Sequence, residues 1–200
     1  MNIEDSEHKD EKDVKDPMKL VFEKQLELAK KYKEIEKLPD WPLQLDLAEH
    51  QKIVKDFKQR GMEEVAEAIE GYRKGEMEHF REELIDALHF FVELNILVGK
   101  DWDFVRYHKY KQREKINLQT LYYNTGILTE KYGLLMNTLK SKPWKQTQVP
   151  TDQAKFYTLL QEAFMFFIKF LHSCGLGYDD IFNYYNRKAD VNSFRIRSQY

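Results

Sequence analysis

Apolar residues recur along most of this chain at intervals of three and four, the spacing that gathers them on one face of an α-helix. Alternation of apolar and polar residues, which is typical of half-buried strands, extends over no useful length. The pattern therefore predicts an all-α fold. The helices that we expect span about residues 17–37, 45–74, 77–98, 102–115, 117–140, 153–174 and 178–187.

Glycine and proline residues separate these helical patterns. The segment 38–42 contains two prolines, which cannot continue a helix. We expect Gly61 to mark a kink or a join within the second helix, and Gly75 to mark the end of that helix. The stretch 142–150 also contains two prolines and is expected to form a loop, and 175–177 is expected to form a turn.

The length and composition indicate a single folded domain. With 200 residues, 42% of them hydrophobic, the chain is long enough to bury a substantial core. Residues 1–16 consist mainly of acids and lysines with almost nothing apolar, which predicts a disordered tail. Residues 17–200 are then expected to form one all-α domain, a helical bundle.

Charge and cysteine content narrow the classes of partner. The 32 basic and 34 acidic residues nearly cancel, so no basic field favours nucleic acid. Cys174 is the only cysteine, which excludes an internal disulfide and suits a reducing compartment. The most apolar window, 156–171, is interrupted by Gln161, Glu162 and Lys169, and the charged start of the chain does not resemble a signal peptide. We therefore expect a cytoplasmic protein that binds neither nucleic acid nor membrane.

Acidic residues gather in the second expected helix, around residues 61–70. Glu64 and Glu67 are three residues apart, so their side chains lie on the same face of a helix. Met62, Val65 and other apolar residues occupy the opposite side. Taken alone, this group is also compatible with a solvated helix face.

The third expected helix repeats this spacing in Glu83 and Asp86, with His89 one step beyond. Its apolar residues between 84 and 97 wrap nearly all the way round, which is typical of a buried helix. Ionised carboxylates on such a helix are costly unless a cation pairs with them. Because lysine and arginine are scarce between 82 and 98, a metal ion is an economical partner.

Magnesium suits these acids best. Mg²⁺ takes carboxylate oxygens, keeps several waters and shares its coordination shell with substrate phosphates. Two pairs of acids facing each other across a helix–helix contact would suit one or more Mg²⁺ ions bridging a triphosphate. The chain has no Gly-rich phosphate loop, so metal ions would do most of the phosphate binding. One cysteine and no paired histidines at ligand spacing disfavour zinc.

Three groups of residues together resemble the dimeric all-α dUTPases, which share a superfamily with the MazG-like and dCTP pyrophosphatases. They are two paired acidic motifs, a closing motif at the C-terminus and one glutamine in the first helix. The residues that carry the resemblance are Glu64-x-x-Glu67, then Glu83-x-x-Asp86-x-x-His89-Phe90, then Tyr185-x-x-Lys188-x-x-x-Asn192-x-Phe194-Arg195-x-x-x-x-Tyr200, together with Gln25.

The resemblance implies an all-α homodimer of the MazG-like type that hydrolyses a deoxynucleoside triphosphate to the monophosphate and pyrophosphate. It implies that Glu64, as the catalytic residue, orients or deprotonates the attacking water. The Mg²⁺ ligands that it implies are Glu64, Glu67, Glu83 and Asp86. The substrate-binding residues that it implies are Gln25 near the base, His89 and Phe90 in the nucleoside pocket, and Lys188, Asn192, Arg195 and Tyr200 at the phosphates and sugar.

Several polar positions of the family pattern are changed in this chain. Leu28 and Ala189 stand where the family has asparagine, Ile196 where it has glutamine, and Gln199 where it has glycine. Lost hydrogen-bonding groups usually shift substrate preference. We expect dUTP as the substrate, with dCTP, dTTP or a modified pyrimidine nucleotide as alternatives. A nucleotide-binding or interaction protein without turnover is the alternative from a different class.

Overall fold

The computed structural model describes residues 16–101, 116–142, 144 and 149–198, and these residues form helices and loops with no strand among them. The all-α prediction is therefore confirmed. The six helices are α1 (Pro17–Glu36), α2 (Ala48–Lys74), α3 (Met77–Leu97), α4 (Leu118–Thr138), α5 (Gln153–Ser173) and α6 (Tyr178–Ser198).

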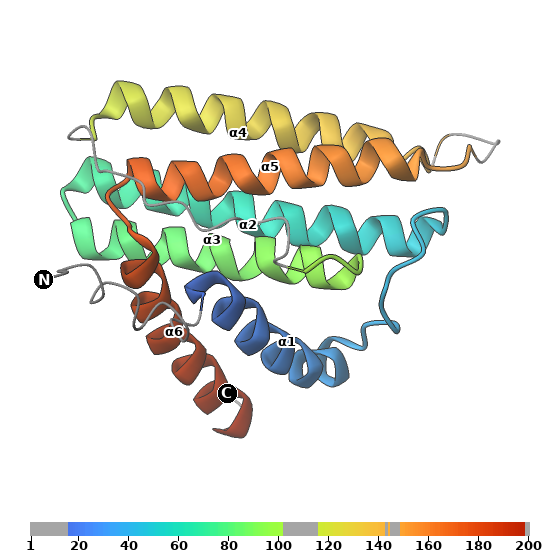
Figure 1. Cartoon of the computed structure of the whole chain (residues 1–200), viewed down its shortest axis with the longest axis horizontal. Coiled ribbons are helices and arrows are strands. Elements are labelled where there is room, and N and C mark those ends of the chain that lie inside the picture. Colours follow the sequence, from blue (N-terminus) through green and yellow to red (C-terminus); the bar gives the residue numbers. More distant parts are fainter. Residues whose placement is uncertain (1–15, 102–115, 143, 145–148, 199–200) are drawn as a thin grey trace, which may run out of the picture.

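The helices pack as three pairs stacked on one another (Figure 1). The α4–α5 pair and the α2–α3 pair run side by side as a bundle of long helices. Helices α1 and α6 contact each other and cover α3 on the side away from α4. The middle helix α3 is therefore enclosed by its neighbours, and nearly every residue from Leu84 to Leu97 is buried, as its apolar circumference predicts.

Local signals in the sequence set several helix ends. Asp16 caps α1 by accepting a hydrogen bond from the amide of Met18, and Asp152 caps α5 by accepting one from the amide of Lys155. Gly75 adopts a left-handed conformation (φ 80°) at the end of α2, as expected of a glycine at that position.

Gly61 was predicted to mark a kink or a join, and helix α2 continues through it without a join. Phe91 packs on Gly61, where a Cβ would lie 2.4 Å from that ring. The predicted end of the last helix was wrong. Helix α6 does not end at Arg187 but runs to Ser198. No glycine or proline interrupts it, and acids in its first turn and arginines in its last turn complement the helix dipole.

Some predictions fall outside the described residues. They are the disordered tail, except for Asp16, the helix expected at 102–115, and the position of Tyr200. Among the residues that are described, no single helix is long and apolar enough to cross a membrane. Helices α5 and α6 together have the length and apolar composition of a membrane span, but the chain bends by 100° between them.

Candidate active site

Three carboxylates meet where α2 packs against α3. One oxygen each of Glu64, Glu83 and Asp86 lies within 4.8 Å of the others, and all three side chains are half-buried. The three-residue spacing on α3 points Glu83 and Asp86 the same way, and the pairing of the helices brings Glu64 to them. Glu67, one turn further along α2, is exposed and lies outside this group. Its role as a metal ligand stays a prediction.

The crowding of acids makes their ionisation unfavourable. Burial raises the pKa of Glu64 to about 8, helped by a hydrogen bond with Glu83 and by the charges of Asp86, Glu83 and Glu67. Burial also raises the pKa of Asp86 to about 6, although Lys188 opposes this change. A cation held among these oxygens would relieve both effects, so the donor set fits a hard divalent ion.

Two of the acids also have partners within the protein. The Lys188 ammonium lies 2.5 Å from Asp86 Oδ2, and His79 Nδ1 lies 3.0 Å from Glu83 Oε1. Basic residues are scarce on α3 itself, but α6 supplies a lysine to Asp86 from about a hundred positions away in sequence. A metal ion is therefore not the only cation that can balance this acid. The partnership of His79 with Glu83 follows from their four-residue spacing, which the sequence analysis did not use.

A cavity of about 240 Å³ opens beside these acids, between α1, α2, α3 and α6. It is lined by eight of the predicted site residues, drawn from all four helices. These are Gln25, Glu64, Asp86, His89, Phe90, Lys188, Asn192 and Arg195. The three residues from α6 form one stripe, since they are spaced by four and three positions. The helices thus bring residues that are as much as 170 positions apart in sequence to one cavity.

Gln25 is the centre of a buried hydrogen-bond network at the inner end of this cavity. Its amide nitrogen donates to Glu93 Oε2 at 2.8 Å. Its amide oxygen accepts from His89 Nδ1 at 2.9 Å and from the hydroxyl of Tyr185. The His89 and Tyr185 rings stack with their centroids 3.9 Å apart. Burial lowers the pKa of His89 to about 3, so the ring is neutral at physiological pH.

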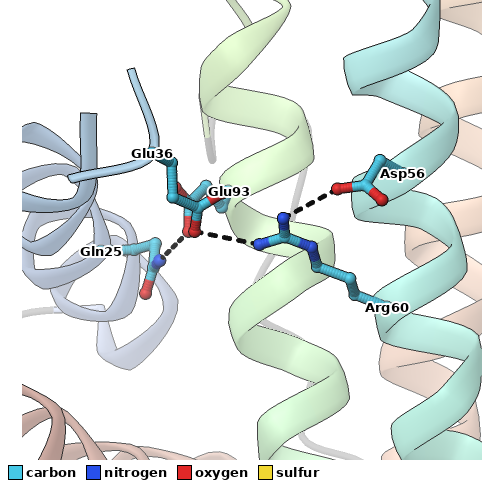
Figure 2. A network of polar contacts seen from close by, with 5 residues as sticks. All are labelled: Gln25, Glu36, Asp56, Arg60 and Glu93. Atoms are coloured by element: carbon cyan, nitrogen blue, oxygen red, sulfur yellow. Dashed lines mark hydrogen bonds and ion pairs between the residues drawn. The ribbon is translucent and has the colours of Figure 1, made fainter. Parts of the chain in front are cut away.

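The cavity also contains charged residues that the sequence analysis missed. Arg60 reaches between two acids: one nitrogen lies 3.0 Å from Glu36 Oε1 and the other 2.8 Å from Asp56 Oδ2 (Figure 2). Glu36, Arg60 and the buried Glu93 all line the cavity. Glu36 and Arg60 occur in charge-rich helices, where they resemble their solvated neighbours. Glu93 differs, because it is an acid inside the apolar run of α3.

The sequence model of a protein family described as dUTPase matches residues 64–200, which include both acidic motifs and the closing motif. The chain belongs to the dUTPase family. The resemblance stated on the paired motifs is thereby confirmed, and with the all-helical fold it supports a dUTPase-like nucleotide hydrolase. Comparisons with curated proteins and with solved structures found no match.

Proposed function

We propose that this protein is a Mg²⁺-dependent pyrophosphohydrolase of pyrimidine deoxynucleoside triphosphates, with dUTP as the reference substrate of its family. The proposal rests on the side chains that line and border one cavity. A cluster of carboxylates borders it on α2 and α3, two cationic side chains line it from α6, and a buried polar network closes its inner end. A nucleotide needs these three environments at its phosphates and at its base.

The residues that would hold the metal are Glu64, Glu83 and Asp86, joined by Glu67 when its exposed side chain turns inward. When bound, Mg²⁺ would neutralise phosphate charge and activate a water molecule at neutral pH. The carboxylates themselves would position the water and the phosphates. A bound cation would offset the burial and the neighbouring negative charges that raise the pKa of Glu64 and Asp86.

Glu64 is the candidate for accepting the proton of the attacking water. It is the member of the cluster that projects from α2, and it faces both acids of α3. A general base works best with a pKa near the operating pH, and the pKa of Glu64 lies at about 8 before a cation binds. A bound cation would lower the pKa of Glu64 from this value.

Helix α6 supplies the groups that would hold the triphosphate. Lys188 and Arg195 carry positive charge along the same stripe as Asn192, and all three line the cavity. Lys188 pairs with Asp86. Because an ammonium interacts with phosphate as a point charge, Lys188 can serve both the carboxylate and a phosphate beside it.

We also propose that the protein is a cytoplasmic homodimer. Helix α4 supports this, because Tyr122, Tyr123 and Leu134 are large apolar side chains that it leaves exposed. Light scattering of the purified protein would give a mass near twice 24.2 kDa. A monomer at all concentrations would contradict the dimer without affecting the catalytic proposal.

Pyrophosphate release from dUTP, dCTP, dTTP, dATP and dGTP, measured with Mg²⁺ and with EDTA, tests the activity. We expect release that needs the metal and is lowered at least about a hundredfold by Asp86→Asn. Glu82→Gln, which removes an exposed acid from the same helix, is the matched control and should keep full activity. Tight nucleotide binding by folded protein without any release would favour the binding protein without turnover.

A further inference from the structure

Two buried polar side chains of α3 form the inner end of the cavity. His89 is 6% exposed and Glu93 is 5% exposed, and both line the cavity. They are four residues apart, so they lie on the same face of α3. Gln25 of α1 holds both, because its amide bridges His89 Nδ1 and Glu93 Oε2. We call His89 and Glu93 the acceptor pair.

The hydrogen bonds of Gln25 decide what the acceptor pair can offer a ligand. The Gln25 amide oxygen accepts a hydrogen bond from His89 Nδ1–H. The other ring nitrogen of this neutral histidine, Nε2, therefore carries a lone pair. Only one carboxylate oxygen of Glu93 accepts a hydrogen bond from Gln25. Within the described part of the chain, His89 Nε2 and Glu93 Oε1 are both buried and have no hydrogen-bond partner. Buried polar atoms rarely stay unpaired, which points to a ligand that donates hydrogen bonds.

Among the residues that the structure describes, the charged side chains around the acceptor pair donate no hydrogen bond to its two unpartnered atoms. The charge of Arg60 lowers the pKa of Glu93, but the two terminal nitrogens of Arg60 bind Glu36 and Asp56 (Figure 2). Glu36 adds a further negative charge that acts on Glu93. The inner end of the cavity is thus acidic, and a base edge that presents only carbonyl oxygens to it would be repelled.

We propose that the acceptor pair, with Glu93 as the specificity-determining residue, selects a base that carries an exocyclic amino group, so that the preferred substrate is dCTP. This inference rests on the proposed function. The amino group of cytosine has two N–H bonds, one for each unpartnered acceptor. Uracil and thymine present a carbonyl oxygen at that position, beside a single N–H.

Leu28 supports the same choice of base. Its side chain is buried, lines the cavity from α1 and offers no donor for a base carbonyl. Tyr32, one turn further along α1, also lines the cavity, but its hydroxyl can donate or accept and therefore does not discriminate among these bases. The donors Lys188, Asn192 and Arg195 line the cavity from α6.

The test compares kcat/KM for dCTP, dUTP, dTTP and dATP at about pH 8.5, where Glu93 with its pKa of about 7 is ionised, and at one Mg²⁺ concentration. We expect wild-type protein to prefer dCTP to dUTP by about tenfold to a hundredfold, the range for one good pair of base contacts. Glu93→Gln keeps an acceptor for Gln25 and adds a donor for a base carbonyl. It should lower the ratio of dCTP to dUTP at least about tenfold. Glu82→Gln is the control and should leave the ratio unchanged.

A wild-type preference for dUTP or dTTP would overturn the inference, and so would a Glu93→Gln variant that slows both substrates equally. A preference for dATP would show recognition of an amino group but would overturn the choice of cytosine. Absence of turnover with every nucleotide would refute the proposed hydrolase and not the base selection. In that case, calorimetric titration with dCTP and dUTP decides the inference, because tighter binding of dCTP is still expected.

Discussion

Replacing Glu93 by glutamine should change how the stability of this protein depends on pH. Burial, and next the charge of Glu36, raise the pKa of Glu93 from 4.5 to about 7, against the opposing effects of Gln25 and Arg60. A group whose pKa is raised on folding stabilises the folded state fully below its unfolded pKa. That contribution is lost as the pH rises through the folded pKa. Wild-type protein therefore loses stability at this site between about pH 4.5 and pH 7, and the effect levels off near pH 8.

The magnitude follows from the two pKa values. A change from 4.5 to about 7 corresponds to about 3 kcal/mol, at about 1.4 kcal/mol for each tenfold change in the ionisation constant. Glutamine has nearly the same shape, still accepts a hydrogen bond from Gln25 and does not ionise. The free energy of unfolding of Glu93→Gln minus that of wild type should therefore rise by about 3 kcal/mol from pH 4.5 to pH 8.

Urea unfolding in EDTA at a series of pH values, at one protein concentration, measures this difference. Subtracting the wild-type curve cancels the other ionisable groups, which both proteins share. Glu82→Gln is the matched control, since it removes a carboxyl that is solvent-exposed on the same helix. A Glu93→Gln curve parallel to that of wild type across the whole range would refute the reasoning. It would mean that Glu93 is solvated in the folded protein.

Further outcomes can be measured on the metal site and on two helical glycines. Lys188→Met should shift the acidic limb of the pH profile of kcat/KM to higher pH, because Lys188 lowers the pKa of Asp86. An unchanged limb would contradict that pairing. Gly61→Ala should destabilise the protein by about 1–3 kcal/mol in urea unfolding, since its Cβ would lie 2.4 Å from a ring carbon. Gly126→Ala, with nothing within 4 Å, should stabilise α4 by about 0.5–1 kcal/mol. Mg²⁺ should raise Tm in a thermal scan, more at pH 8.5 than at pH 6, because it must displace the proton of Glu64, whose pKa is about 8. Loss of this increment in Glu64→Gln is expected, and an equal increment at both pH values would contradict the linkage.

Much of the candidate site could be predicted because helical spacing carries geometric information. Residues three or four apart share a face, so the pairing of Glu83 with Asp86 follows from the sequence. The stripe from Lys188 to Arg195 does not, because the sequence pattern predicted that the last helix ends at residue 187, whereas α6 runs to Ser198. The apolar circumference of α3 likewise predicts that this helix is buried. These inferences are local and need no knowledge of how the helices pack.

What helical spacing did not reveal is mainly the set of contacts between helices. Glycine weakens a helix, yet Gly61 lies within α2 because it allows the ring of Phe91 to approach closely. Asp86 has a partner in Lys188 of α6, about a hundred positions away in sequence. Glu93 lies inside the apolar run of α3, and only the packing of α1 places Gln25 against it.

The sequence by itself thus determined the class of fold and the family, and it singled out three acids that meet in the structure, Glu64, Glu83 and Asp86. Hydrophobic period and motif spacing are properties of the chain alone. Only the tertiary structure decided which charges are partnered, which polar atoms are left without a partner and where the cavity lies. The physical reason is that burial and long-range pairing set the cost of a charge, and both arise when α1 and α6 pack over α3.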